Sequence, residues 1–120
     1  MSWLKLSLSA FTGLLAIIST VQAQVKNYNN GQLAALGYIA AAVVAKDRCP
    51  TIKISQEATV LLLQFSKLEL SDLSSLPAIT LVKLTTSVAD KQGASFCTEV
   101  WEAYGPNGSV APMLLFGKLP

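Results

Sequence analysis

Cys49 and Cys97 are the two cysteines of the chain, and they are the first residues whose type allows a specific chemistry. An even number of cysteines in an exported chain indicates a disulfide, and these two allow a single pairing within one chain. A redox-active pair normally has the C-x-x-C spacing, which is absent here. Two free buried thiols are the remaining alternative. We predict a structural bridge, which should stabilise the domain by about 4 kcal/mol because it restricts the unfolded chain.

The sequence contains no histidine. This absence excludes Ser-His and Cys-His nucleophile pairs and every metal site built on imidazole. Two carboxylate pairs have helical spacing, Glu99 with Glu102 and Glu69 with Asp72, but charged side chains are mostly solvated. No phosphate-binding glycine loop and no calcium-loop pattern occurs in the sequence. We predict a protein that is not an enzyme and has no catalytic residues, metal or cofactor; carboxylate or serine chemistry is the minor alternative.

The sequence Asn107-Gly108-Ser109 matches the acceptor pattern for N-glycosylation. The pattern has this meaning only in a eukaryotic secretory pathway. The same residues follow Gly105-Pro106 and are also typical of a turn. Both interpretations stay open at the level of sequence.

Aromatic side chains gather around the second cysteine. In a helix Cys97, Val100, Trp101 and Tyr104 would lie on adjoining turns of one side, with Phe96 beside them. An aromatic cluster around a disulfide is the usual core of a small secreted domain. Trp101 and Tyr104 also carry polar tips, so that, if exposed, they are candidates for contact with a partner.

The charges of the chain are sparse and mixed, with nine Lys and Arg against seven Asp and Glu. The basic residues are scattered singly along the sequence, whereas tracking a phosphate backbone requires them to cluster on one face. We predict no binding to nucleic acid.

Residues 1 to 23 have the three parts of a secretory signal peptide. These are a short start with Lys5, an uncharged run over Leu6–Val21, and a small residue, Ala23, before Gln24. The uncharged run would reach roughly 24 Å as a helix, short of a hydrocarbon core of about 30 Å, so cleavage after Ala23 is favoured over a membrane anchor. We predict an exported product of residues 24 to 120, periplasmic or extracellular, with no stable membrane span after signal removal.

The segment 31–48 is predicted to be a helix, capped by Asn29 or Asn30. Its interior, Leu33–Ala45, carries no charge. A helix that is apolar nearly all round is either buried or associated with a membrane, and this interior is too short to span one. Gly37 and Ala41 form a small-residue strip that predicts close approach of another helix.

Two further helical segments follow. Ser55 is a plausible N-cap for a helix over 56–70, and Ser75 begins a segment over 75–104. Near Gly93 this segment is either one kinked helix or two short ones. The predicted apolar face of the helix over 56–70 consists of Ala58, Leu61, Leu62, Phe65 and Leu68.

Two short segments have no helical pattern. Residues 50–54 are predicted to be an extended connector, too short to demand a sheet. Residues 110–120 form an apolar tail that begins after the stop at Gly105-Pro106, and it must pack either over its own helices or on a partner. The candidate partner contacts are Trp101, Tyr104, Met113, Leu114, Leu115 and Phe116.

These features predict an all-α fold, a small three- or four-helix array with one disulfide in a single domain over 24–120. The layout is similar to that of small periplasmic acid-stress chaperones. We predict a non-enzymatic secreted or periplasmic protein, with a binding, structural or chaperone-like role in the cell envelope. Its partner would be a protein or peptide, including a second copy of the chain. The alternative is a membrane-active or toxin-like peptide that acts through the helix over 31–48.

Overall fold

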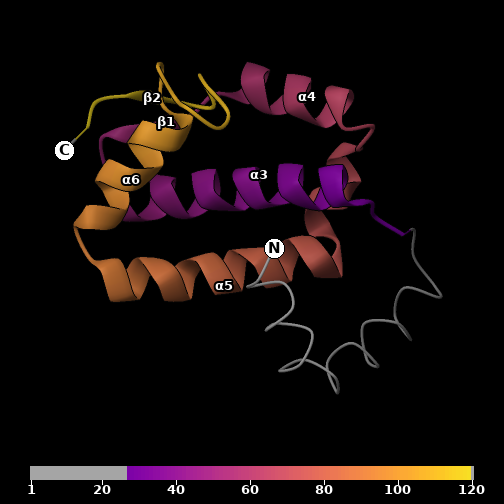
Figure 1. Ribbon diagram of the computed structural model, residues 1–120, viewed down its shortest axis with the longest axis horizontal. Coiled ribbons are helices and arrows are strands. Elements are labelled where there is room, and N and C mark those ends of the chain that lie inside the picture. The colour runs from indigo at the N-terminus through magenta and orange to yellow at the C-terminus, as the bar shows by residue number, and fades with distance from the viewer. Residues whose placement is uncertain (1–26, 120) are drawn as a thin grey trace.

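The computed structural model describes residues 27–119 and is mostly helical (Figure 1). The predicted signal peptide, residues 1 to 23, lies outside the described residues. In the described part there are four α-helices, as the sequence analysis allowed, together with one 3-10 helix and two short strands. Their bounds in chain order are α3 (Asn30–Arg48), β1 (Ile52–Ile54), α4 (Gln56–Phe65), η1 (Leu70–Ser74), α5 (Leu76–Gln92), α6 (Ser95–Tyr104) and β2 (Leu115–Gly117).

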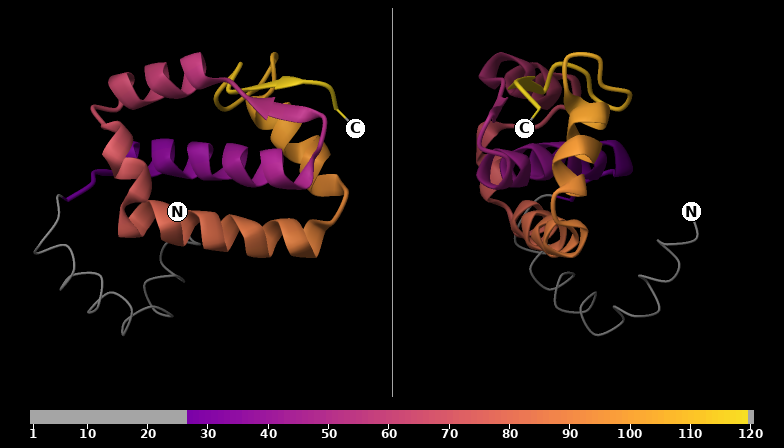
Figure 2. Two further views of the ribbon diagram at one scale, coloured as in Figure 1. Left: turned by 180° about the vertical axis from the view of Figure 1, so that it is seen from behind. Right: turned by 90° about the vertical axis from the view of Figure 1, so that its left-hand side faces the viewer.

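The central element is α3. It begins with a capping box, in which the Asn29 side chain accepts from the Gln32 backbone N–H at 2.8 Å and the Gln32 side chain accepts from the Asn29 N–H at 3.0 Å. Helix α5 lies on one side of α3, and α4 and the two strands lie on the other (Figures 1 and 2). This placement between two layers explains how a helix without charge in its interior is accommodated. The buried interpretation of this segment is confirmed.

Gly37 does not take part in the close helix approach that the sequence predicted. Ala41 is buried, but a Cβ added at Gly37 would meet no atom within 4 Å. The neighbouring helices therefore come close to α3 elsewhere along its length, and Gly37 is a helix-interior glycine without a packing role.

Helix α4 is shorter than predicted because it ends at Phe65 instead of continuing to residue 70. Lys67 adopts a left-handed backbone with φ of 58°, and the N–H of Leu68 donates to the carbonyl oxygen of Leu63 at 2.8 Å. This is a Schellman-type ending. A lysine occupies the position where glycine is usual, so the end of the helix could not be predicted from residue type.

The segment over 75–104 forms two helices instead of one kinked helix. The Ser75 side chain caps α5 by accepting from the Ala78 N–H at 3.3 Å. Gly93 ends α5 with a positive φ of 61°, a conformation that favours glycine. Helix α6 then runs from the α5 layer toward the strands (Figure 2).

The connector and the tail pair with each other in a small antiparallel sheet, which the sequence analysis did not predict. Lys53 lies opposite Phe116, and Ile54 lies opposite Leu115. Beyond the strand, the Lys118 N–H donates to the Thr51 carbonyl oxygen at 3.0 Å. The two strands are far apart in sequence and only three residues long, so no local pattern reveals their pairing.

We expect Gly37→Ala to stabilise the protein by about 0.5 to 1 kcal/mol, because alanine lowers the backbone entropy lost in a helix and meets open space here. The urea midpoint measures the change. Gly105→Ala is the control, since its new Cβ would clash with the Trp101 carbonyl oxygen and should destabilise the fold. A Gly37→Ala protein with a lowered midpoint would contradict the described packing.

A second prediction compares two adjacent tail residues. Leu115 is fully buried and Phe116 is 45% exposed. Leu115→Ala should therefore lower the free energy of unfolding by about 2 to 5 kcal/mol, because it leaves a cavity in the core, and Phe116→Ala should have a much smaller effect. Equal effects of the two substitutions would show that the tail is not packed as described.

Candidate functional site

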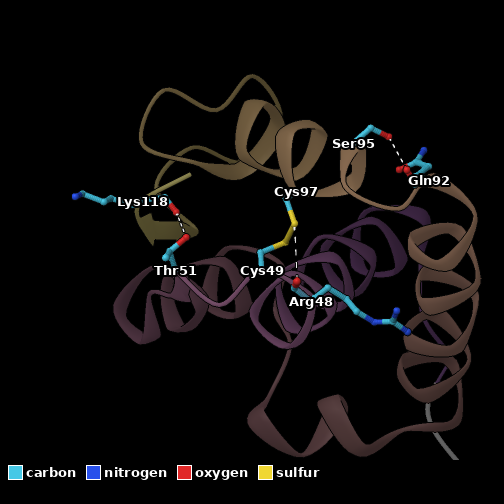
Figure 3. The surroundings of a disulfide bond; sticks show 7 residues. All are labelled: Arg48, Cys49, Thr51, Gln92, Ser95, Cys97 and Lys118. Atoms are coloured by element: carbon cyan, nitrogen blue, oxygen red, sulfur yellow. Dashed lines mark hydrogen bonds between the residues drawn. A yellow bond between two sulfur atoms is a disulfide. The ribbon is translucent and has the colours of Figure 1, made fainter. Parts of the chain in front are cut away.

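The predicted disulfide is confirmed. Cys49 and Cys97 are bonded, with their Cα atoms 5.9 Å apart, and Cys49 is fully buried. The bridge joins the C-terminal end of α3 to α6 (Figure 3). Beside it Arg48 forms an ion pair with Asp90, but both side chains are about half exposed, so the pair contributes little to stability. The disulfide is therefore a structural crosslink between α3 and α6.

The aromatic residues of α6 are mainly core residues. Phe96 is buried in the same hydrophobic cluster as Cys49, and Trp101 packs against that cluster while partly exposed. The Tyr104 ring lies 5.8 Å from the Tyr38 ring, centroid to centroid. Burial, and to a smaller extent the nearby Tyr38, raises the pKa of Tyr104 above its usual value. This phenol therefore stays protonated at physiological pH and is not a candidate base.

The carboxylates of the two predicted pairs differ in burial. Glu99 and Glu102 are exposed, as expected. Asp72, by contrast, is buried: its carboxylate accepts from the Tyr28 hydroxyl and from the Glu69 backbone N–H, both at 2.7 Å. Asp72 thereby ties the residues before α3 to η1, which is a structural role that the sequence analysis missed.

No group of three or more Cys, Asp or Glu side chains within residues 27–119 is placed to hold a metal ion. None of the helices in this part of the chain has the length and apolar character needed to cross a membrane.

The predicted contact residues of the tail fall into two classes. Leu114 and Leu115 are buried in the main core cluster, so they do not belong to a surface. Met113 is 65% exposed and Phe116 is 45% exposed. The tail therefore folds over its own domain, which was the preferred interpretation, and leaves only part of the predicted contact set on the outside.

A second exposed apolar surface lies on α4, where burial was predicted. Phe65 is 86% exposed, and Val60 and Leu61 are 48% and 47% exposed. We call these three residues the α4 face. The side of α4 that packs inward instead carries Leu62 and Leu63, together with Leu68 after the helix.

The predicted buried positions of Leu61 and Phe65 were wrong for a physical reason. Residues 60–63 are all apolar, and a helix that rests on a single neighbour can bury only one side of such a run. Because α4 packs mainly on α3, the surplus side chains point outward. The uninterrupted apolar run was the signal that could have revealed this surface.

Comparison with known protein families, with curated proteins and with solved structures finds no match to this chain.

We predict that replacing Cys49 and Cys97 together by serine lowers the free energy of unfolding by about 2 to 5 kcal/mol, the range for small domains that lose a bridge. The loss arises because the unfolded chain gains freedom while α6 is no longer held to α3. Chemical denaturation of the oxidised protein and the double variant measures it. Free thiols detected by alkylation of the native protein would contradict the bridge.

Proposed function

We propose that the protein is an exported, non-enzymatic binding protein of the periplasm or extracellular space, with a chaperone-like role, which recognises apolar segments of other proteins through the α4 face. The single observation that carries the proposal is the exposure of Phe65, Val60 and Leu61 on one short helix. Contiguous exposed apolar surface is unfavourable in water and is typical of a site that a partner covers.

The location of other exposed apolar residues supports this choice of surface. Met113 and Phe116 belong to the tail, which lies on the same side of α3 as α4 (Figure 1). An apolar partner could therefore contact α4 and then the tail without crossing the molecule. Trp101 and Tyr104 pack against the core cluster and are only partly exposed, so we assign them a smaller part in recognition.

Helix α5 also exposes apolar side chains, but they are less suited to recognition. Leu84 and Val88 are 49% and 46% exposed, and the helix lies on the opposite side of α3. The α5 surface has no exposed aromatic residue, whereas aromatic side chains are frequent energetic centres of interfaces. This difference favours α4 and makes α5 a suitable control surface.

The membrane-active alternative receives less support. It requires the apolar side chains of α3 to meet lipid, yet Leu36, Ile39 and Val44 are all buried in the folded domain. Exposing them would require α5 or the α4 layer to separate from α3, with loss of core packing. The exported location is supported by the leader pattern of residues 1 to 23 and by the disulfide, which is typical of oxidising compartments.

The test uses two matched double variants, Val60→Gln with Leu61→Gln on α4 and Val88→Gln with Leu84→Gln on α5. The four positions are exposed to nearly the same extent, so both variants should fold with similar stability. Light scattering measures how well each protein suppresses aggregation of reduced insulin, a client that exposes apolar segments. We expect the α4 variant to need about tenfold more protein for the same suppression, from the loss of roughly 1.4 kcal/mol of apolar contact.

Sedimentation velocity of the same proteins tests binding to a second copy. Equal activity of the α4 variant and the wild type in both assays would contradict the α4 face as the binding surface. A wild-type protein that neither suppresses aggregation nor associates would contradict the proposed function as a whole.

A further inference from the structure

The turn after α6 carries the Asn107-Gly108-Ser109 pattern, which the proposed binding function does not use. Pro106 and Asn107 form the centre of a turn that is closed by a hydrogen bond from the Gly108 N–H to the Gly105 carbonyl oxygen, at 2.9 Å. The Ser109 N–H then donates to the Glu102 carbonyl oxygen at 3.1 Å. These bonds hold the pattern in one conformation against the end of α6.

The three residues of the pattern differ in exposure. The side chains of Asn107 and Ser109 are exposed, whereas Gly108 approaches α6 so closely that an added Cβ would clash with the Ala103 carbonyl oxygen. The two side chains that a glycosylating enzyme reads thus face solvent, and the residue that must lack a side chain lies between them. A glycan on Asn107 would extend into water without displacing any core residue.

Asn107 also borders a shallow depression on the surface. Its other lining residues are Trp101, Glu102 and Pro106. Trp101 is partly exposed here, and the negative face of an indole attracts the positively polarised C–H groups of a sugar ring. The first sugar of a glycan on Asn107 would have an apolar surface within reach.

We propose that Asn107 is an N-glycosylation acceptor and that the first sugar of its glycan packs on Trp101. The donor is a lipid-linked oligosaccharide pyrophosphate of a eukaryotic secretory pathway. In the transfer, the Asn107 side-chain nitrogen bonds to the anomeric carbon of the sugar and releases one proton to a base of the glycosylating enzyme. The bond from that carbon to the pyrophosphate breaks, and the pyrophosphate leaves with the electron pair. The inference rests on the export that the proposed function includes, and it applies to the extracellular one of the two locations proposed there.

A glycan on Asn107 would affect the Trp101 side of α6 and the α4 face differently. It would cover the Trp101 side of α6 with a hydrated group and withdraw this residue from contact with protein partners. Phe65 lies at the end of α4 that points away from α6 (Figure 1). The glycan would therefore leave the Phe65 end of the α4 face free for recognition.

The experiment secretes the full chain from cultured eukaryotic cells and measures its intact mass before and after treatment with peptide-N-glycosidase. We expect the wild type to lose the mass of one oligosaccharide on treatment. Ser109→Thr should behave in the same way, because threonine also satisfies the acceptor pattern. Ser109→Ala and Asn107→Gln should be secreted without any glycan mass.

The fluorescence of Trp101 tests the proposed contact between this residue and the first sugar. The sequence has two tryptophans, and the other, Trp3, is in the predicted leader. The fluorescence of the secreted protein therefore comes from Trp101 alone. Because the glycosidase converts the glycosylated asparagine to aspartate, removal of the glycan should shift the emission to longer wavelength, to the value of the Asn107→Asp protein.

The outcomes separate the two proposals. A product that starts at Gln24 and carries no glycan overturns the acceptor assignment and leaves the binding function intact. A chain that is not exported overturns both. A glycan whose removal leaves the Trp101 emission unchanged overturns the contact with Trp101 while supporting Asn107 as the acceptor.

Discussion

The absence of charge from the interior of α3 is the constraint on which the other elements depend. A helix of this kind must be covered on several sides, because each Å² of apolar surface left in water costs roughly 25 cal/mol. Helix α5 covers one side, and α4 with the two strands covers the other. Several of the buried α3 side chains are alanines, so the covering elements can approach the helix backbone closely. The three-layered arrangement follows from this requirement.

Two long-range links hold the short covering elements in place near the C-terminal end of α3. Helix α6 has 10 residues and each strand has three, which is too short for independent stability in water. The Cys49–Cys97 bridge ties α6 to α3, and the pairing of β1 with β2 ties the tail to the residues that directly follow α3. At the other end of the molecule Asp72 links the residues before α3 to η1 through Tyr28.

The same arrangement leaves apolar surface outside. Helix α4 has 10 residues with a largely apolar second half, and it rests on α3 with one side only. Its remaining side chains have no intramolecular neighbour that could cover them, and this surplus supports the proposed recognition of apolar segments. At the end of α6 the backbone instead presents polar side chains over a partly exposed indole, which suits a hydrated modification. The two proposed sites thus use parts of the surface with opposite chemistry.

The sequence by itself determined the local features of this protein. The caps at Ser55 and Ser75, the helix end at Gly105 and the single possible cysteine pairing each depend on one residue type and its immediate neighbours. At the start of α3 and at Gly93 the sequence left two alternatives, and the structure has the cap at Asn29 and a break into two helices. The mostly helical class and the burial of α3 followed from periodicity and charge.

The tertiary structure alone decided which apolar residues of the tail and of α4 are inside. Leu114 and Leu115 are core residues because β2 pairs with a strand far away in sequence, whereas Leu61 and Phe65 are exposed because only one side of α4 has a neighbour. Both outcomes depend on contacts between distant segments, and a local pattern of apolar residues does not specify which of its sides another element will cover.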